Sequence, residues 1–346
     1  MNQKYDYRVI MIAKGKRINS GHQLDSCFVR AQLDSIRPHV KEVVPFAIDD
    51  TVSPWGILRN AMELRGLISS IRPDIVHAQW GSTTAVIGLL ATHNKAIPLI
   101  ISFCGSDLIE IGGGSIIKRL RSKLAVAIGR FCSRYAEVVI VKSANLYALL
   151  PKAVKAKAYA LPNGVDMAKF RVMPKIKARR LLSWDPDLSI ILFSIGGILG
   201  RETVINLKLA EAAFSILKAE NNIALEKIRG VPHEMMPVYL NASDVLLVTS
   251  LHEGSPNIVK EAMACNLPVV TVKCGDVSER LENVYPSRVV TSYDPRSIAI
   301  ATMEILQSKK RPNGRKELRE QHLEIESVAE KLVKIYDVAV NRSSKI

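Results

Sequence analysis

Two glutamates that flank a short helical pattern are the residues of this sequence whose spacing most clearly suggests chemistry. The stretch TSLHEGSPNIVKEAMACNLPVV, residues 249–270, carries Glu253 in the turn before the helix and Glu261 eight residues later, inside the helix. Carboxylates at a helix N-terminus favour the helix dipole but repel an anionic ligand. A site with this pair therefore needs a positive group from another source.

That positive group is expected to come from the backbone. Ser255 can cap the helix and Pro256 is preferred at its first position, and Gly254 leaves the peptide groups before them unobstructed. The N–H groups of Gly254, Ser255 and Asn257 can then point at a diphosphate, while the two carboxylates accept hydrogen bonds from sugar hydroxyls. The alternative is that the first glutamate only favours the dipole and the second is a solvated helix residue.

Composition limits the classes of function. The chain has 346 residues, 48% apolar and 5% aromatic, and too few aromatics for a platform that stacks single-stranded nucleic acid. Residues 1–165 hold 22 Lys and Arg against 11 Asp and Glu, whereas residues 166–346 hold 26 against 22. This basic half favours an anionic partner, although surface lysines can also serve solubility alone. No segment reads as a transmembrane span or a signal peptide, and five scattered cysteines are typical of a cytoplasmic protein.

Short β-branched runs alternate with helical patterns along the whole chain, which predicts an α/β fold with parallel sheets flanked by helices. The expected strands lie at 8–13, 42–48, 74–79, 98–103, 137–143 and 158–162, and then at 189–196, 224–230, 244–250, 268–274 and 288–292. A Pro-rich, charged segment separates the two series, so we expect two doubly wound domains, 1–165 and 166–325, with ligands at the carboxyl ends of the strands. The last helical pattern, 315–340, is read as one helix. The C-terminal segment 326–346 is expected to be a helix that packs back towards the first domain.

The stretch E-G-S-P-N-x-V-x-E-A-x-A, followed by P-V-V and by Gly275-Asp276, resembles the donor motif of family-4-type retaining glycosyltransferases. The resemblance implies the GT-B fold, in which two facing Rossmann-like domains enclose a cleft. It also implies that Glu253 contacts the transferred sugar and Glu261 the nucleoside ribose. The segment ALPNGVDMAKF, residues 160–170, resembles the family's P-N-G-V-D-x-x-x-F at the junction of the domains.

The first half resembles the family less closely. DIVHAQWG resembles D-x-x-H-x-H, with His77 in the first histidine position and Gln79 in the second. ISFCGSDL resembles T-x-H-G-x-D, with Cys104 in the histidine position and with Gly105 and Asp107 kept. The resemblance implies that His77 and Asp107 belong to the catalytic site, with the other three residues on the acceptor side. His77 can also be a satisfied histidine at a strand end.

Relatives place an Arg and a Lys between the first strand and helix of the second domain, where they hold the leaving diphosphate. Arg201 is the expected clamp and Gly197 lies in the same donor-side segment, SIGGILGRETVINLKLAE. The lysine position is occupied by Ile205, and Lys208 is close but falls among residues that look like core. In the first domain, Gly15 or Gly21 is expected to serve as the loop glycine after the first strand.

The resemblance implies transfer of a sugar, of hexosyl type, from a nucleoside diphosphate sugar to an acceptor hydroxyl with retention, and no cofactor or metal. Asp185-Pro186-Asp187 formally matches a metal-binding DxD, but the proline favours a turn. The nucleotide sugar is the expected partner, with a lipid-linked or polysaccharide acceptor, and nucleic acid is not.

Residues 115–134 form a basic amphipathic pattern. Its basic members are Lys118, Arg119, Arg121, Lys123, Arg130 and Arg134, and its apolar members include Ile116, Ile117, Leu120, Leu124 and Phe131. The pattern predicts either contact with an anionic membrane surface or an ordinary surface helix with its apolar face on the sheet.

The sequence therefore favours a cytoplasmic, peripherally membrane-bound glycosyltransferase of surface polysaccharide or glycolipid synthesis. Three alternatives stay open: a catalytically degenerate GT-B protein that acts as a binding subunit, a GT-B sugar-nucleotide epimerase, and a nucleic-acid binder without a visible base-reading module. A Rossmann dehydrogenase would need G-x-G-x-x-G after the first strand, which AKGKRINSG lacks.

Overall fold

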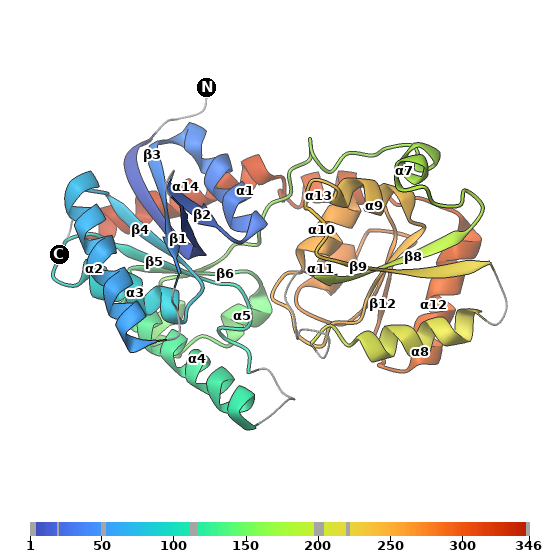
Figure 1. The fold of residues 1–346 in the computed structure, drawn as a ribbon, viewed down its shortest axis with the longest axis horizontal. Coiled ribbons are helices and arrows are strands. Elements are labelled where there is room, and N and C mark those ends of the chain that lie inside the picture. Colours follow the sequence, from blue (N-terminus) through green and yellow to red (C-terminus); the bar gives the residue numbers. More distant parts are fainter. Residues whose placement is uncertain are drawn as a thin grey trace. The chain divides into compact units, whose positions relative to one another are not determined.

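The computed structural model describes residues 5–18, 21–49, 53–110, 116–196, 204–218 and 222–343. The contacts divide the chain into two compact units. Met1–Gly164 and Ile325–Ile346 form the first unit, and Val165–Glu324 forms the second. Each unit is a mainly parallel sheet with helices on both faces, and the two sheets are separate (Figure 1).

The sheet of the first unit has the parallel order β3-β1-β4-β5-β6-β7. Its strands are β1 (Tyr5–Ile18), β3 (Val40–Ile48), β4 (Ile75–Gln79), β5 (Leu99–Phe103), β6 (Val138–Val141) and β7 (Ala158–Ala160). Their runs of β-branched and aliphatic residues are buried because helices cover both faces. The strand order reverses beside β1, so the loop that follows β4 leaves the sheet at a topological switch point.

The segment after the first predicted strand is a hairpin and not a glycine loop. β1 continues to Ile18 and pairs antiparallel with β2 (Gly21–Leu24). Gly15 lies inside β1, where a Cβ atom would overlap the carbonyl oxygen of Gln23. The expectation that Gly15 is a loop glycine is therefore wrong, because the extended backbone pairs with its own return strand; Gly21 is the first residue of that strand.

Helices cover the two faces of the first sheet. They are α1 (Cys27–Ile36), α2 (Pro54–Ile71), α3 (Thr83–Thr92), α4 (Ile116–Tyr135), α5 (Ala144–Ala148), α6 (Lys152–Lys155) and α14 (Ile325–Ser343), with a 3₁₀ turn at Arg37–His39. One core contains Leu64 of α2 and Ile87 of α3, and the other contains Leu33 of α1 and Leu332 of α14. The C-terminal helix thus belongs to the core of the first unit.

The second unit has the parallel strand order β12-β11-β10-β8-β9. Its strands are β8 (Ser189–Gly196), β9 (Ile223–Arg229), β10 (Val245–Val248), β11 (Val269–Val272) and β12 (Arg288–Val290). Its helices are α7 (Lys175–Leu182), α8 (Leu207–Lys218), α9 (Met236–Ala242), α10 (Asn257–Ala264), α11 (Val277–Leu281), α12 (Pro295–Ser308) and α13 (Gly314–Glu320). The strand order reverses between β8 and β10, so the loop that carries Glu253 leaves the sheet at the switch point.

The single C-terminal helix predicted over 315–340 is wrong. The chain breaks between α13 and α14, with His322 in the left-handed region at φ 53°. Leu323 packs in a core of the second unit, whereas Val328 packs in a core of the first unit. The break occurs because neighbouring segments of one helical pattern are buried in different units.

Candidate functional site

The loop after β10 is tied to the segment that precedes α8. The Thr249 hydroxyl contacts the carbonyl oxygens of Ile205 (2.8 Å) and Asn206 (3.0 Å). The backbone N–H of Leu251 donates to the carbonyl of Val204 (2.8 Å). These bonds fix the start of the Glu253 loop beside the segment in which relatives place their cations.

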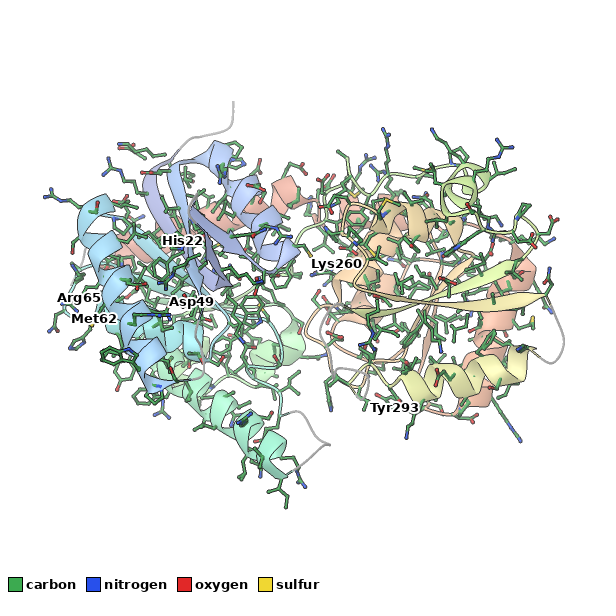
Figure 2. The ribbon with its side chains drawn as sticks, in the orientation of Figure 1. His22, Asp49, Met62, Arg65, Lys260 and Tyr293 are labelled. Carbon is green, nitrogen blue, oxygen red and sulfur yellow. The ribbon has the colours of Figure 1, made fainter. Side chains whose placement is uncertain are left out.

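Pro256 is the N-cap residue of α10, and its side chain can accept no hydrogen bond. The prediction that Ser255 caps the helix and that Pro256 is its first residue is therefore wrong. The Ser255 hydroxyl instead contacts Lys260 Nζ (3.0 Å), and the Lys260 side chain is fully buried. Figure 2 marks Lys260 on α10. No side-chain cap blocks the helix N-terminus, and this is the condition that an anion site requires.

The turn at Gly275 contacts the backbone of the same Glu253 loop. Gly275 has φ +53°, and a Cβ atom there would lie 2.6 Å from the carbonyl oxygen of Gly254 and 3.1 Å from that of Glu253. Asp276 is buried, and its Oδ2 accepts a hydrogen bond from Arg280 Nε (3.1 Å). Burial raises the pKa of Asp276, while the charges of Lys260 and Arg280 oppose that rise. The backbone of Glu253–Gly254 therefore rests directly on a turn that only glycine fits.

Glu261 lies in the second turn of α10, where a chain of polar contacts holds it. Its Oε1 is 2.9 Å from His233 Nε2, and His233 Nδ1 is 2.8 Å from Lys169 Nζ. An ammonium group can only donate, so Nδ1 accepts and the ring proton on Nε2 is donated to Glu261. Phe170 packs against the His233 ring, with centroids 5.3 Å apart.

The segment resembling P-N-G-V-D-x-x-x-F is the source of this support. Asp166 Oδ1 accepts hydrogen bonds from the backbone of Ala168 (2.9 Å) and Lys169 (2.8 Å). This turn places Lys169 and Phe170 beside His233. His233, Lys169 and Lys260 were not predicted as site residues. Lys169 and Lys260 lie inside the two stretches that resemble the family, which is the signal that could have found them, whereas His233 lies outside both.

The remaining donor-side residues divide into two groups. Gly197 and Arg201 lie outside the described residues. Ile205, at the position expected for a lysine, is buried in the core beneath α8. Lys208 is exposed, whereas Leu209 beside it is buried, so Lys208 lies on the outer face of α8.

His77 is fully buried in the middle of β4, with a partner for each ring nitrogen. Nε2 lies 2.8 Å from Ser102 Oγ, and Nδ1 lies 2.7 Å from the hydroxyl of Tyr336 in α14. Burial, with a smaller contribution from the charge of Lys142, lowers the pKa of His77 to about 3. The imidazole is therefore neutral and links the sheet to α14, and both of its nitrogens are occupied in this conformation.

Asp107 has a comparable structural environment. Its buried carboxylate accepts hydrogen bonds from the backbone of Gly81 (2.7 Å), Gly105 (2.8 Å) and Cys104 (3.1 Å). Burial raises the pKa of Asp107, and these backbone hydrogen bonds oppose that rise. The aspartate thus holds together the loops that follow β4 and β5.

Gln79 is the last residue of β4, and Cys104 directly follows the neighbouring strand β5. Gln79 is fully buried and its Nε2 donates to Gln32 Oε1 of α1 (2.7 Å). Cys104 is half-buried, and burial raises the pKa of its thiol to about 12. The structure brings His77, Gln79, Cys104, Gly105 and Asp107 together at one edge of the first sheet, and it places Glu253 in the loop before α10 and Glu261 within α10.

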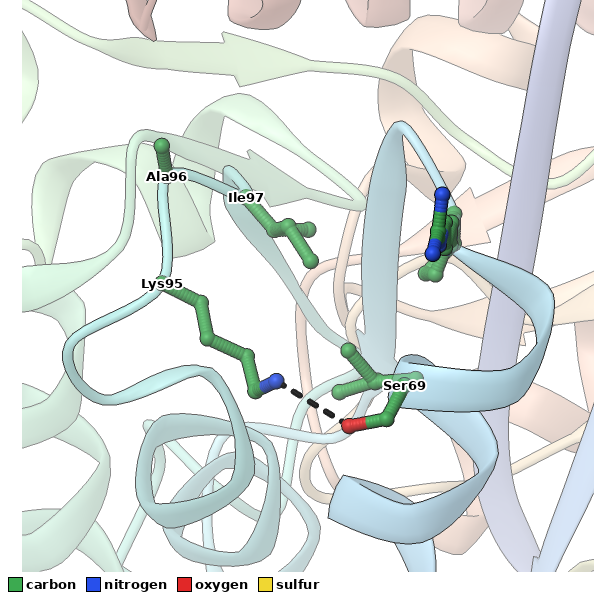
Figure 3. A pocket seen from close by; sticks show the side chains of 7 residues that line it. Ser69, Lys95, Ala96 and Ile97 are labelled. Carbon is green, nitrogen blue, oxygen red and sulfur yellow. Dashed lines mark hydrogen bonds between the residues drawn. The ribbon is translucent and has the colours of Figure 1, made fainter.

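The Asp185-Pro186-Asp187 segment and a hollow in the first unit take no part in this site. Asp185 Oδ1 accepts a hydrogen bond from the backbone of Asp187 (2.8 Å), and both residues are exposed, so the predicted turn is confirmed. A hollow of about 490 Å³ lies at the end of α2 and the start of β5, where Lys95 Nζ donates to Ser69 Oγ (3.3 Å) (Figure 3). It is at the amino ends of the strands, opposite to the residues described above, and takes no part in this site.

Helix α4 exposes large apolar side chains between its basic residues. The exposed fractions are 75% for Ile116, 60% for Leu120, 60% for Leu124 and 52% for Phe131. The narrow buried side of the helix contains Val126 and small residues. The expectation that the whole apolar pattern packs on the sheet is therefore wrong. None of the helices that the structure describes is both long enough and apolar enough to cross a membrane.

Comparison with known proteins identifies the family. The family "Glycosyl transferases group 1" matches residues 197–308, and the family "Glycosyl transferase 4-like" matches residues 21–143. A putative teichuronic acid biosynthesis glycosyltransferase, TuaC of Bacillus subtilis, is 26% identical over 232 residues, which are 60% of this chain and 54% of TuaC. The chain thus matches about half the length of this relative.

Solved structures share the fold along nearly the whole chain. Sucrose-phosphate synthase from Thermosynechococcus elongatus superposes with a TM-score of 0.75 at 16% identity, covering 96% of this chain and 98% of that one. Anabaena Alr3699/HepE in complex with UDP and glucose gives 0.68 at 15% identity, covering 95% and 98%. With two matched segments that together span more than half of the chain, the protein belongs to the family-4-type glycosyltransferases with the GT-B fold.

Proposed function

We propose that the protein is a retaining glycosyltransferase that transfers a hexose from a nucleoside diphosphate sugar to an acceptor hydroxyl. The observation that carries the proposal is Glu261, held by His233 in the second turn of a helix whose N-terminus has no side-chain cap. A carboxylate there accepts from a ribose diol while the backbone N–H groups face a diphosphate. The UDP and glucose bound by Alr3699/HepE favour UDP-hexose as the first donor to test.

In the reaction, bond breaking leaves negative charge on the diphosphate, so stabilising that anion is the main catalytic task. The N-terminus of α10 supplies backbone donors for it, and we assign Arg201 as the side-chain donor. Glu253 contacts the transferred sugar. The proposal includes no metal ion, because backbone and guanidinium donors carry the anion. Gly275 and Asp276 keep the Glu253 loop in place and need not contact the donor.

We assign the acceptor to surface polysaccharide or glycolipid synthesis, which is supported by the printed name of the TuaC relative. The exposed apolar residues of α4, such as Leu120 and Leu124, alternate with Arg119, Arg121 and Lys123. A helix of this kind binds the interface of an anionic membrane. The enzyme would then work peripherally, at the cytoplasmic face of the membrane. Flotation with anionic liposomes tests this, and absence of binding at low salt contradicts it.

The donor site is tested by thermal unfolding with UDP and UDP-glucose. A ligand at about 100 times its Kd adds about 2.7 kcal/mol to the free energy of unfolding, which is readily measured. Glu261→Ala is expected to weaken UDP binding at least about tenfold, because a hydrogen bond to a charged group is lost. Glu253→Ala is expected to leave UDP binding unchanged and to slow transfer by about 100-fold or more. Reversed effects of the two variants would contradict the assigned roles.

A second candidate function, a non-catalytic binding subunit of the same fold, is favoured by the first unit. Gln79 and Cys104 replace two family histidines, and both nitrogens of His77 are bonded within the protein. Such a protein binds UDP without turnover. Release of UDP from UDP-glucose, assayed with and without acceptor, separates the two functions.

A further inference from the structure

Lys142 is a buried lysine that the proposed mechanism does not use. It follows the four apolar residues of β6, and because Phe103 pairs with Val141, it comes next to Cys104 at the carboxyl edge of the sheet. Its side chain is 2% exposed, and its Nζ has no hydrogen-bond partner among the residues that the structure describes.

An unpaired buried ammonium is costly, so its environment calls for an explanation. Asp107 is near enough for its charge to act on Lys142, but its carboxylate oxygens already accept three backbone N–H groups. Burial lowers the pKa of Lys142, while the groups of Cys104 and Asp107 oppose that change. The loop aspartate therefore does not replace a direct partner for the ammonium.

A second unsatisfied atom lies on the same face of the sheet. Gln79 Oε1 is buried without a hydrogen-bond partner, although its Nε2 donates to Gln32. Gln79 ends β4, Cys104 follows β5 and Lys142 follows β6, and these three strands are neighbours (Figure 1). The two unsatisfied residues are thus two strands apart, and Lys142 lies two residues further along its strand, which gives about 12 Å between their backbones.

The backbone at this edge is also strained. Trp80, directly after Gln79, has φ 71°, which is uncommon for a bulky residue. Its indole packs against Phe28 of α1, with ring centroids 5.6 Å apart. Strain of this kind is maintained by surrounding contacts and is concentrated at functional sites. The half-buried Cys104 beside Lys142 shows that the edge is not sealed from solvent.

We propose that Lys142 and Gln79 form a binding site for an acidic sugar, in which Lys142 donates to an anionic oxygen and Gln79 Oε1 accepts from a hydroxyl. The two unsatisfied atoms have opposite hydrogen-bonding requirements, and a ligand with both an acid group and hydroxyls meets both. The anion is a carboxylate or a phosphate. Identification of this sugar as the acceptor rests on the proposed function, whereas the anion site itself does not.

The test uses the full chain and measures the thermal shift and the Kd of four probes: D-glucuronate, D-glucose 6-phosphate, D-glucose and UDP. Wild type is expected to bind glucuronate or glucose 6-phosphate and to bind glucose at least about tenfold more weakly. Lys142→Met, which keeps the length of the side chain and removes the charge, is expected to lose this preference and to bind UDP as wild type does. Lys152→Met, at an exposed lysine of the same unit, is the matched control and should keep it.

The unfolding transition shows whether Lys142→Met is folded, and the variant should be at least as stable as wild type, because a buried charge without a partner is removed. A response to glucuronate alone assigns a carboxylate, and a response to glucose 6-phosphate alone assigns a phosphate. The inference is overturned if neither acid binds wild type, or if Lys142→Met binds them as tightly. Binding of UDP without either acid refutes this inference alone, whereas binding of the acids without UDP refutes the donor site.

Discussion

Gly275→Ala is the substitution whose effect on the donor site can be worked out most directly from the structure. The added methyl group would lie 2.6 Å from the carbonyl oxygen of Gly254 and 3.1 Å from that of Glu253. Both neighbours are backbone atoms of the loop that presents Glu253, so neither can rotate away as a side chain would. The loop must therefore shift, or the turn at Gly275 must open.

Two costs add. The residue has φ +53°, and an L-residue in this region costs about 1–2 kcal/mol. Overpacking against a well-packed neighbour costs about 1–3 kcal/mol more. We expect the free energy of unfolding to fall by about 2–5 kcal/mol, and transfer to fall by about 100-fold, as for a misplacement of about 1 Å near the reacting groups.

Gly230→Ala is the matched control, because Gly230 has φ +63° in the same unit and a Cβ atom there meets nothing within 4 Å. It should show only the backbone cost and should keep wild-type transfer. Urea unfolding and transfer from UDP-glucose are measured on both variants. Equal losses of stability and activity in the two would refute the argument that the Gly275 turn supports the Glu253 loop.

Three further outcomes are expected. His77 binds a proton below pH 6.5 in the unfolded chain but only near pH 3 in the folded one. Wild type should therefore lose about 1.4 kcal/mol of unfolding free energy per pH unit as the pH falls through this range, and His77→Gln should remove that contribution; parallel slopes in acid unfolding would argue against it. His233→Phe keeps the packing on Phe170 and removes the hydrogen bond to Glu261, so the Kd of UDP should rise several-fold, and an unchanged Kd would exclude a positioning role. EDTA should leave transfer intact, and complete loss of turnover would contradict the metal-free proposal.

Much of the fold could be read from local patterns. The apolar run 189–196 is a strand over the predicted residues, and β3 and β5 differ from the predicted strands 42–48 and 98–103 by at most two residues at either end. Periodicity succeeds here because each element is buried within one sheet. The hairpin of β1 and β2 was missed because Lys14, Lys16 and Arg17 interrupt the apolar pattern, and only pairing with a return strand makes that segment extended.

The positions of site residues were predictable where they depend only on residues close along the chain. Glu253, Gly254 and Glu261 lie within one loop and one helix, so their positions follow from the sequence. The cap was assigned wrongly because Lys260, inside the helix, contacts the Ser255 hydroxyl. The Ser255 hydroxyl bonds to Lys260 instead of capping the helix because Lys260 is buried, and burial cannot be read from a local sequence pattern.

The sequence by itself determined the fold class, the alternation of strands and helices and the carboxylate pair, because these depend on periodicity and on residues close along the chain. The tertiary structure alone decided which of the polar residues are satisfied. His77 meets Tyr336 across 259 positions of sequence, whereas Lys142, between apolar strand residues and Ser143, meets no partner at all among the described residues. The physical reason is that the free energy of a buried polar group depends on atoms brought to it from distant segments, which only the folded chain provides.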